Sequence, residues 1–318
     1  MGSTTRMTLL SLAIDPKTPM DAQRLAHGLQ QLTAENSALC VRSGQIMGPV
    51  VIGCVSEHHL EIVVDRLKRE FDVEATVSRP QVAYREAVTR AAEGEAKYAG
   101  QASGRGQYGH VKIRLYPGQP GTGYVFQDHI SDGAIPTTFI HAIEQGIQDA
   151  LTRGVRAGYP IDGVRVELHD GSYHDVDSNE VAFRIAGALA AEDALRKAAP
   201  IVLEPVMQVE AVVPAECLSD VIKNLVSRRG QIRSREECGK TAVIRAVVPL
   251  ADLFSYECDL RSRTYGRGTH TMQFEAYVPL QATDDDDARD ALVGVPRKPA
   301  PPLRGSRVAL PEPDEDGR

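Results

Sequence analysis

Residues 49–77 read PVVIGCVSEHHLEIVVDRLKREFDVEATV and predict a strand, a helix and a second strand in succession. The helix is indicated by apolar residues at i, i+3, i+4, i+7 and i+11, namely Leu60, Val63, Val64, Leu67 and Phe71. Ser56 is the expected N-cap, because its hydroxyl can accept a hydrogen bond from a free N–H of the first turn. The short apolar run Pro49–Gly53 and the alternating stretch Val73–Val77 predict the flanking strands.

The residues on the N-terminal side extend this pattern to a complete unit over residues 8–82. Thr8–Ile14 is an apolar run typical of a strand, and Pro19–Glu35 carries leucines at helical spacing. Ala38–Arg42 predicts one more strand before Pro49. Two helices on one face of an antiparallel sheet make an α+β sandwich.

Residues 200–280 repeat the same order of strands and helices. The predicted strands are Val206–Val213, Gln231–Arg235, Thr241–Pro249 and Thr269–Val278. The predicted helices are Pro214–Arg228 and Leu250–Arg261. Two units of one architecture therefore flank a middle segment.

The middle segment, residues 83–199, has a different pattern. Strands are predicted at His110–Tyr116, Val125–Ile130 and Val164–His169. Pro136–Arg153 is expected to be a helix, and Ser178–Ala199 a long alanine-rich helix that Ser178 opens.

Composition and charge narrow the class of protein. The chain has 318 residues, a net charge of −7, 42% hydrophobic and 25% charged residues, which is typical of globular proteins. No apolar stretch approaches the ~20 residues of a membrane helix. Residues 281–318 hold six prolines, nine acidic and six basic residues, so we expect a disordered tail that serves either as a solvating or as an interaction segment. The five cysteines lack C-x-x-C spacing, which argues against disulfide or zinc sites and favours reduced thiols in the cytoplasm.

Three partial motifs fail on their context. Residues 104–109 fit G-x-G-x-x-G, but a strand follows where a dinucleotide site needs a helix. Residues 234–241 resemble a phosphate-binding loop but join two strands, and residues 174–180 lack the glycine of a calcium loop. No H-E-x-x-H or G-x-S-x-G motif occurs, so we expect neither a metal site nor a catalytic residue.

Several longer strings carry a resemblance to a known family. They include HLEIVVDRLKREF (59–71), PQVAYREAV (80–88), SGRGQYGHVKI (103–113), GVRAGYPIDGV (154–164), DGSYHDVDSNEVAFRIAG (170–187), LEPVMQVEAVVP (203–214), RRGQI (228–232) and DLRSRTYGRGTHTMQF (259–274). Together they resemble the last three domains of elongation factor G, the translational GTPase that moves tRNA and mRNA through the ribosome. The resemblance runs from Leu9 to Pro279.

The resemblance implies a domain assignment. Residues 8–82 would be domain III and residues 200–280 domain V, both ferredoxin-like α/β sandwiches. Residues 83–199 would be domain IV, a ribosomal-protein-like fold whose βαβ crossover is left-handed, against the usual rule. Residues 281–318 remain outside the family pattern.

The resemblance also implies which residues contact the ribosome. The tip of domain IV reaches the decoding centre and the tRNA–mRNA duplex, which implies roles for Arg105, Gly106, Gln107, Tyr108, Gly109, His174, Asp175 and Asp177. Glycines let backbone N–H groups approach phosphates, although the same glycines could simply make a turn. Domain V packs on ribosomal RNA, which implies roles for Arg228, Arg229, Arg261, Arg263 and Arg267. A solvated arginine face is the alternative there.

The GTP-hydrolysing domain of the family has no counterpart in the sequence. No complete phosphate-binding loop is present, and no asparagine is followed by lysine as N-K-x-D requires. We therefore expect no enzymatic activity and no cofactor, since GTP and magnesium bind the missing domain in the family. Residues 54–58 also depart from the family's G-M-G-E-L pattern, and Lys is absent at Thr137.

Four functions follow from this pattern. The first is a monomeric ribosome-binding module of translation elongation without a GTPase domain, which binds no membrane. The second is half of a split translocase whose GTPase is a separate polypeptide. The third is a nonfunctional remnant or truncated gene, and the fourth is a tetracycline-type ribosomal protection factor.

Overall fold

The computed structural model describes residues 8–43, 49–102, 105–131 and 133–280. These residues form two compact units. The first unit combines the described residues up to Tyr84 with Glu204–Val278, and the second comprises Arg85–Leu203 with Pro279 and Leu280. The α+β class expected from the sequence is confirmed. The disorder expected for residues 281–318 concerns residues outside those described.

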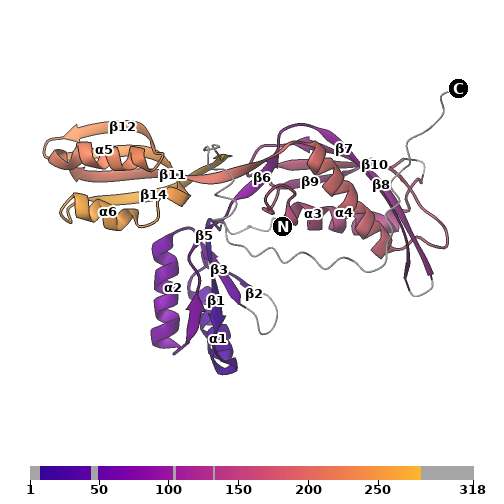
Figure 1. Ribbon diagram of the computed structural model, residues 1–318, viewed down its shortest axis with the longest axis horizontal. Coiled ribbons are helices and arrows are strands. Elements are labelled where there is room, and N and C mark those ends of the chain that lie inside the picture. The colour runs from indigo at the N-terminus through magenta and orange to yellow at the C-terminus, as the bar shows by residue number, and fades with distance from the viewer. Residues whose placement is uncertain (1–7, 44–48, 103–104, 132, 281–318) are drawn as a thin grey trace. The chain divides into compact units, whose positions relative to one another are not determined.

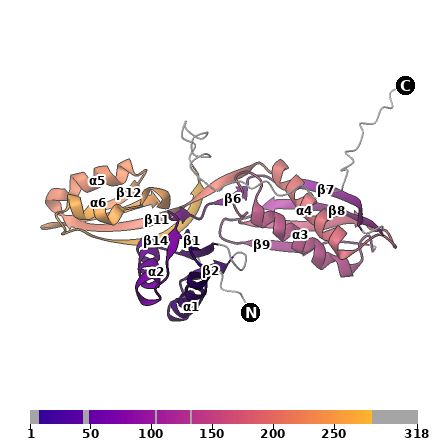
Figure 2. The same ribbon diagram turned by 60° about the horizontal axis from the view of Figure 1, so that its bottom comes forward.

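The N-terminal part of the first unit is a sandwich of one sheet and two helices. The sheet has the order β2-β3-β1-β4, with β5 beside β1. Its strands are β1 (Leu10–Pro16), β2 (Cys40–Ser43), β3 (Val50–Cys54), β4 (Ala75–Val77) and β5 (Gln81–Val82). The helices α1 (Pro19–Glu35) and α2 (Glu57–Glu70) lie side by side (Figures 1 and 2). The Ser56 hydroxyl accepts the His59 N–H at 3.2 Å, which confirms the predicted N-cap.

The C-terminal part of the first unit has the sheet order β12-β13-β11-β14. Its elements are β11 (Pro200–Pro214), α5 (Leu218–Ser227), β12 (Gln231–Cys238), β13 (Thr241–Pro249), α6 (Tyr256–Arg263) and β14 (Thr269–Pro279). Both predicted helices start too early. Three-residue 3₁₀ turns at Ala215–Cys217 and Leu250–Asp252 follow the prolines that end β11 and β13, and the α-helices begin only after these turns.

The second unit has a four-stranded sheet of order β7-β8-β10-β9, with α3 and α4 packed together on it (Figure 1). Its elements are β7 (Ala92–Ala102), β8 (Arg105–Pro117), β9 (Tyr124–Asp128), a 3₁₀ turn (Thr137–Phe139), α3 (Ile140–Arg153), β10 (Val164–Ser172) and α4 (Glu180–Lys197). β9 and β10 pair in parallel and α3 connects them, so the expected βαβ unit is present. Its left-handed sense stays a prediction of the resemblance.

Small residues allow α4 to approach its neighbours closely. A Cβ atom on Gly94 of β7 would lie 2.1 Å from the Ala190 carbonyl oxygen, and one on Gly146 of α3 would lie 2.0 Å from that of Arg184. Phe183 of α4 is fully buried and stacks on Phe139 with ring centroids 4.8 Å apart. The alanine-rich sequence of α4 is therefore a packing requirement of the second unit.

Residues 154–159, which we call the base loop, fold around one buried carboxylate. Glu86 belongs to β6 (Arg85–Val88), which pairs with the first residues of β11, and its side chain is fully buried. Its two carboxylate oxygens accept the N–H groups of all residues from Val155 to Tyr159, at 2.7–3.1 Å. This network explains why the strings at 80–88 and 154–164 occur together, because each supplies one half of it.

Candidate nucleic-acid interface

Two loops of the second unit meet at one end of its sheet. They are residues 106–109 at the start of β8 and residues 173–178 after β10, and we call them together the tip. The Tyr108 N–H donates to the Asp177 carbonyl at 2.9 Å. The Ser178 hydroxyl donates to the Tyr108 carbonyl at 2.9 Å and accepts the His174 N–H at 2.9 Å. The tip residues predicted from two distant strings are thus joined by one main-chain hydrogen bond and by the Ser178 side chain.

The prediction that Ser178 opens the long helix is wrong. α4 begins at Glu180, and its N-cap is Asn179, whose side chain accepts the Ala182 N–H at 2.9 Å. The reason is that the Ser178 hydroxyl already has two partners in the tip, so the next residue takes over the cap. Ser178 therefore belongs to the candidate site.

The His174 side chain lies at the surface of the tip. Its Nδ1 atom is 3.3 Å from the Asp177 carboxylate and 3.3 Å from the Asp177 N–H. A neutral ring accepts from the N–H and a protonated ring donates to the carboxylate, so Asp177 orients the imidazole in either state. The ring is 58% exposed. Its centroid lies 6.4 Å from that of Tyr108, and such a pair can stack with an unpaired RNA base.

The tip glycines have a packing role. A Cβ atom on Gly106 would lie 2.4 Å from an Asp177 carboxylate oxygen, and one on Gly109 would lie 3.0 Å from the Ala182 backbone. Gly106 therefore leaves room for the second loop and Gly109 for the first turn of α4, and neither has a positive φ. Gln107 is half-buried and Asp175 is exposed. Ser103, Gly104 and the side chain of Arg105 lie outside the described part of the chain.

A ladder of polar side chains beneath the tip was not found by sequence reasoning. The Ser172 hydroxyl lies 2.8 Å from the Tyr108 hydroxyl and 3.0 Å from His110 Nδ1. The other ring nitrogen of His110 lies 2.7 Å from the Glu95 carboxylate. This hydrogen bond lowers the pKa of the Glu95 carboxyl below its usual value. The signal was available, because the strand β8 has polar residues on every second position from Tyr108.

Arg228 and Arg229 use their guanidinium groups inside the C-terminal sandwich. Arg229 makes two bonds of 2.9 and 2.8 Å to the buried Glu204 carboxylate. Its Nε atom donates to Asp252 at 2.7 Å. Arg228 donates to the Asp259 carboxylate at 2.6 Å and to the Asp252 and Phe254 carbonyls. These contacts give both arginines a structural role, and their predicted contact with ribosomal RNA stays a prediction.

The three other predicted arginines lie at the surface of the same sandwich. Arg261 is 67% exposed and pairs with Glu257 within α6 at 2.7 Å. Arg267 pairs with Glu216 and stays 54% exposed. Arg263 is exposed and has no ion pair with a described residue. These side chains can exchange their partners for a phosphate group more easily than Arg228 or Arg229.

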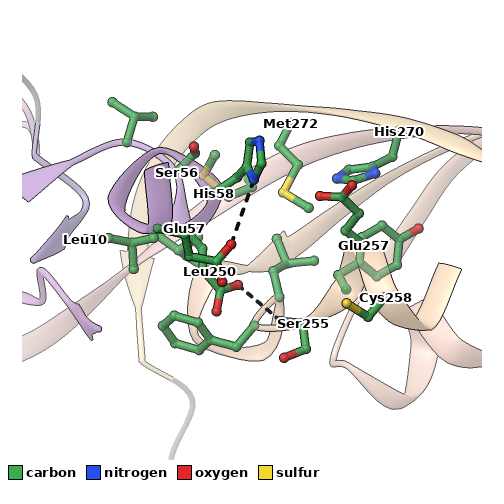
Figure 3. Close-up of a pocket in the computed structure, with 16 residues that line it drawn as sticks. Leu10, Ser56, Glu57, His58, Leu250, Ser255, Glu257, Cys258, His270 and Met272 are labelled. Carbon is green, nitrogen blue, oxygen red and sulfur yellow. Dashed lines mark hydrogen bonds and ion pairs between the residues drawn. The ribbon is translucent and has the colours of Figure 1, made fainter. Parts of the chain in front are cut away.

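The first unit also holds a cavity of about 350 Å³ (Figure 3). It is lined from the N-terminal part by Leu10, Val55, Ser56, Glu57, His58 and Glu61, and from the C-terminal part by Met207, Leu250, Leu253, Phe254, Ser255, Tyr256, Glu257, Cys258, His270 and Met272. Glu57 accepts the Ser255 N–H at 3.1 Å. Burial lowers the pKa of His270 and raises the pKa of Tyr256 to about 12. Residues 55–58, which depart from the family pattern, form part of this wall.

Metal clusters and membrane spans do not occur in the described residues. Residues 8–43, 49–102, 105–131 and 133–280 contain no group of three or more His, Cys, Asp or Glu side chains placed to hold a metal ion. Within these ranges, no helix combines the length and the apolar composition needed to cross a membrane.

Comparison with known proteins places the chain in a family. Three family models match consecutive segments: elongation factor G domain III at residues 7–79, domain IV at 80–199 and the C-terminus at 201–287. The chain belongs to the elongation factor G family. The tip thus lies in the domain IV segment, and Arg261, Arg263 and Arg267 lie in the C-terminal segment.

A solved structure is similar over most of the chain. The crystal structure of ttk003000868 from Thermus thermophilus matches with a TM-score of 0.70 and 34% sequence identity. The match covers 92% of this chain but only 44% of that one. The chain therefore spans less than half the length of this relative.

Proposed function

We propose that the chain is a cytoplasmic ribosome-binding module of translation elongation, which contacts RNA without hydrolysing GTP itself. Family membership and the geometry of the tip support this function. The observation that carries it is the joining of both predicted tip loops through Tyr108, Asp177 and Ser178, with the His174 ring exposed. On this proposal the tip enters the decoding centre and contacts the tRNA–mRNA duplex.

The arginines of residues 200–280 fall into two groups, those proposed to contact RNA and those that hold the fold together. Residues 200–280 contain ten basic and ten acidic side chains, so phosphate binding has to come from local clusters. Arg261, Arg263 and Arg267 are suited to this role because they are exposed. Arg228 and Arg229 would affect RNA binding indirectly, by holding the C-terminal sandwich together.

Co-sedimentation with purified ribosomes tests this function. The full chain should pellet with ribosomes at low salt and be released as salt rises, because phosphate contacts release counterions. The His174→Ala variant should weaken binding by about 1 kcal/mol, the lower range for a base stacked on an aromatic ring. His141→Ala is the matched control, since His141 is an exposed histidine on α3. The absence of pelleting at low salt would contradict the proposal.

A split translocase is the second candidate, favoured by the 44% coverage of the Thermus thermophilus relative. In this case a separate polypeptide supplies the GTPase domain and binds GTP and magnesium. Mixing the chain with such a polypeptide and ribosomes should stimulate GTP hydrolysis above the rate of that polypeptide alone. An unchanged rate of GTP hydrolysis would contradict the split-translocase hypothesis.

A further inference from the structure

An open groove of about 480 Å³ lies in the second unit, where β6 and β11 meet the end of α4. It is lined by Thr89, by Val155 and Arg156 of the base loop, by Arg196 of α4 and by residues 199–201. The groove is far along the chain from the tip residues. It has no role in the function proposed above.

The rim of this groove carries an excess of positive charge. Arg156 donates to the Pro200 carbonyl at 2.9 Å, and Arg90 donates to the Lys197 carbonyl at 2.7 Å. Neither arginine forms an ion pair with a carboxylate among the described residues. Arg196 and Arg153 share a single carboxylate, Glu192, at 3.2 and 3.3 Å.

The position of the groove at the C-terminal end of α4 explains only part of its positive charge. Cations in the last turn of α4 complement the negative end of the helix dipole, and Arg196 is one of them. Arg156 lies in the base loop and Arg90 follows β6, so neither belongs to that helix. Their guanidinium groups have donors left over for an anion.

The described chain ends beside this groove. The Leu280 N–H donates to the Val202 carbonyl at 2.9 Å. Because the end of β14 lies beside the first residues of β11, the two neighbouring strands run in opposite directions. At Leu280 the strand therefore points along β11 toward Ile201 and Pro200, both of which line the groove.

The next residues have the complementary charge. Residues 281–291 read QATDDDDARDA and contain five acidic residues and one basic residue. Asp284–Asp287 follow Leu280 by four to seven residues, a reach of up to ~13–25 Å at about 3.3–3.6 Å per extended residue. A short tether also gives an effective concentration in the ~mM range, so weak individual contacts are sufficient.

We propose that Asp284–Asp287 bind in this groove, with their carboxylates on Arg156 and Arg196 and on the neighbouring Arg90. The groove is then an internal binding site for the start of the tail. In this state the acidic segment covers arginines that would otherwise attract the phosphates of RNA. The interaction is electrostatic and weakens as salt rises.

The test uses backbone amide NMR spectra of the full chain. In a variant with Asp284, Asp285, Asp286 and Asp287 all changed to Asn, the signals of Thr89, Arg156 and Ile201 should shift. High salt should move the wild-type signals toward the same positions. In the reverse experiment, Arg156→Gln with Arg196→Gln should shift the signals of Asp284–Asp287.

The matched control removes the same number of charges farther along the tail. It carries Glu312→Gln, Asp314→Asn, Glu315→Gln and Asp316→Asn, and it should leave the groove signals in place. Equal shifts in both variants, or no groove shift with the four asparagines, would overturn the proposal. A groove that responds to a short RNA but not to the four asparagines would be a phosphate-binding surface instead, which also overturns it.

Discussion

The base loop and the tip lie in the same unit but use their polar groups in opposite ways. In the base loop, five consecutive N–H groups donate to the buried Glu86 carboxylate. None of these N–H groups is therefore left to bind another molecule. In the tip, the Tyr108 N–H and the Ser178 hydroxyl hold the two loops together, and the His174 side chain stays exposed. The comparison shows that two loops of one unit, each quoted for the same family resemblance, can have different roles. The base loop stabilises the fold, whereas the tip leaves a side chain exposed for recognition.

Removal of the Glu86 carboxylate is the largest expected effect. Glu86→Ala leaves the five base-loop N–H groups without an acceptor in the interior, and we expect a loss of about 4 kcal/mol in unfolding free energy. Urea denaturation measures it. Glu93→Gln is the control, since Glu93 is an exposed carboxylate whose partner is Arg114, and its stability should hardly change. Equal stability of both variants would refute the structural role of Glu86.

Two glycine substitutions compare the loops directly. Gly154 has φ 61° and its Cβ would lie 2.1 Å from the Tyr159 carbonyl, so Gly154→Ala should cost about 2 kcal/mol in unfolding free energy. Gly106→Ala meets only the end of the Asp177 side chain, which can rotate away. Its stability should fall much less. If thermal denaturation gives the opposite order, the tip is the more rigid of the two loops.

Ser178→Ala removes the hydroxyl that bridges both loops of the tip. We expect a loss of about 1 kcal/mol in unfolding free energy, the usual net value for a hydrogen bond. Amide hydrogen exchange is the sharper measurement, since the His174 N–H loses its acceptor and should exchange faster. The Ala182 N–H, which Asn179 caps, should keep its protection. Unchanged exchange at His174 would show that the bridge does not hold the loop.

The smallest effect concerns acid stability beneath the tip. The His110 hydrogen bond lowers the folded-state pKa of Glu95 below its usual 4.5, so it stabilises the fold above that pH. This contribution is lost as pH falls through the folded-state value. Glu95→Gln should therefore flatten the decline in unfolding free energy below pH 4.5. The side chain is 58% exposed, so solvent screening keeps the change small. An identical decline in both proteins would exclude the ladder as its cause.

The sequence predicted the elements whose signal is local. The stripe from Leu60 to Phe71 placed α2, and the Ser56 cap was confirmed because it depends on residues three positions apart. The long strand β7 was missed, since the face of Ala92–Ala102 that packs on the core has small residues such as Ala92 and Ala96 in place of large aliphatic ones. Helix α4 packs closely on β7 at Gly94. This contact joins residues far apart in the sequence, so no local pattern predicts it.

The candidate site was predicted only where its residues are close in sequence. The loops of the tip came from their strings, but the bonds between them depend on positions about 70 residues apart. The partners of Arg229, Glu204 and Asp252, lie more than 20 residues away. Sequence reasoning could identify the arginines, therefore, but could not separate those that hold the fold from those that face solvent.

The pairing of β6 with β11 has a consequence for how the chain is built. Arg85 and Leu203, which bound the segment of the second unit that lies between the two parts of the first unit, are paired on adjacent strands. This segment is therefore an insertion whose two ends are one strand spacing apart. During synthesis it can close on itself as soon as Leu203 has emerged. The first unit can be completed only after Glu204–Val278 has been synthesised. Residues 8–84 must therefore stay folded as a separate sandwich until then.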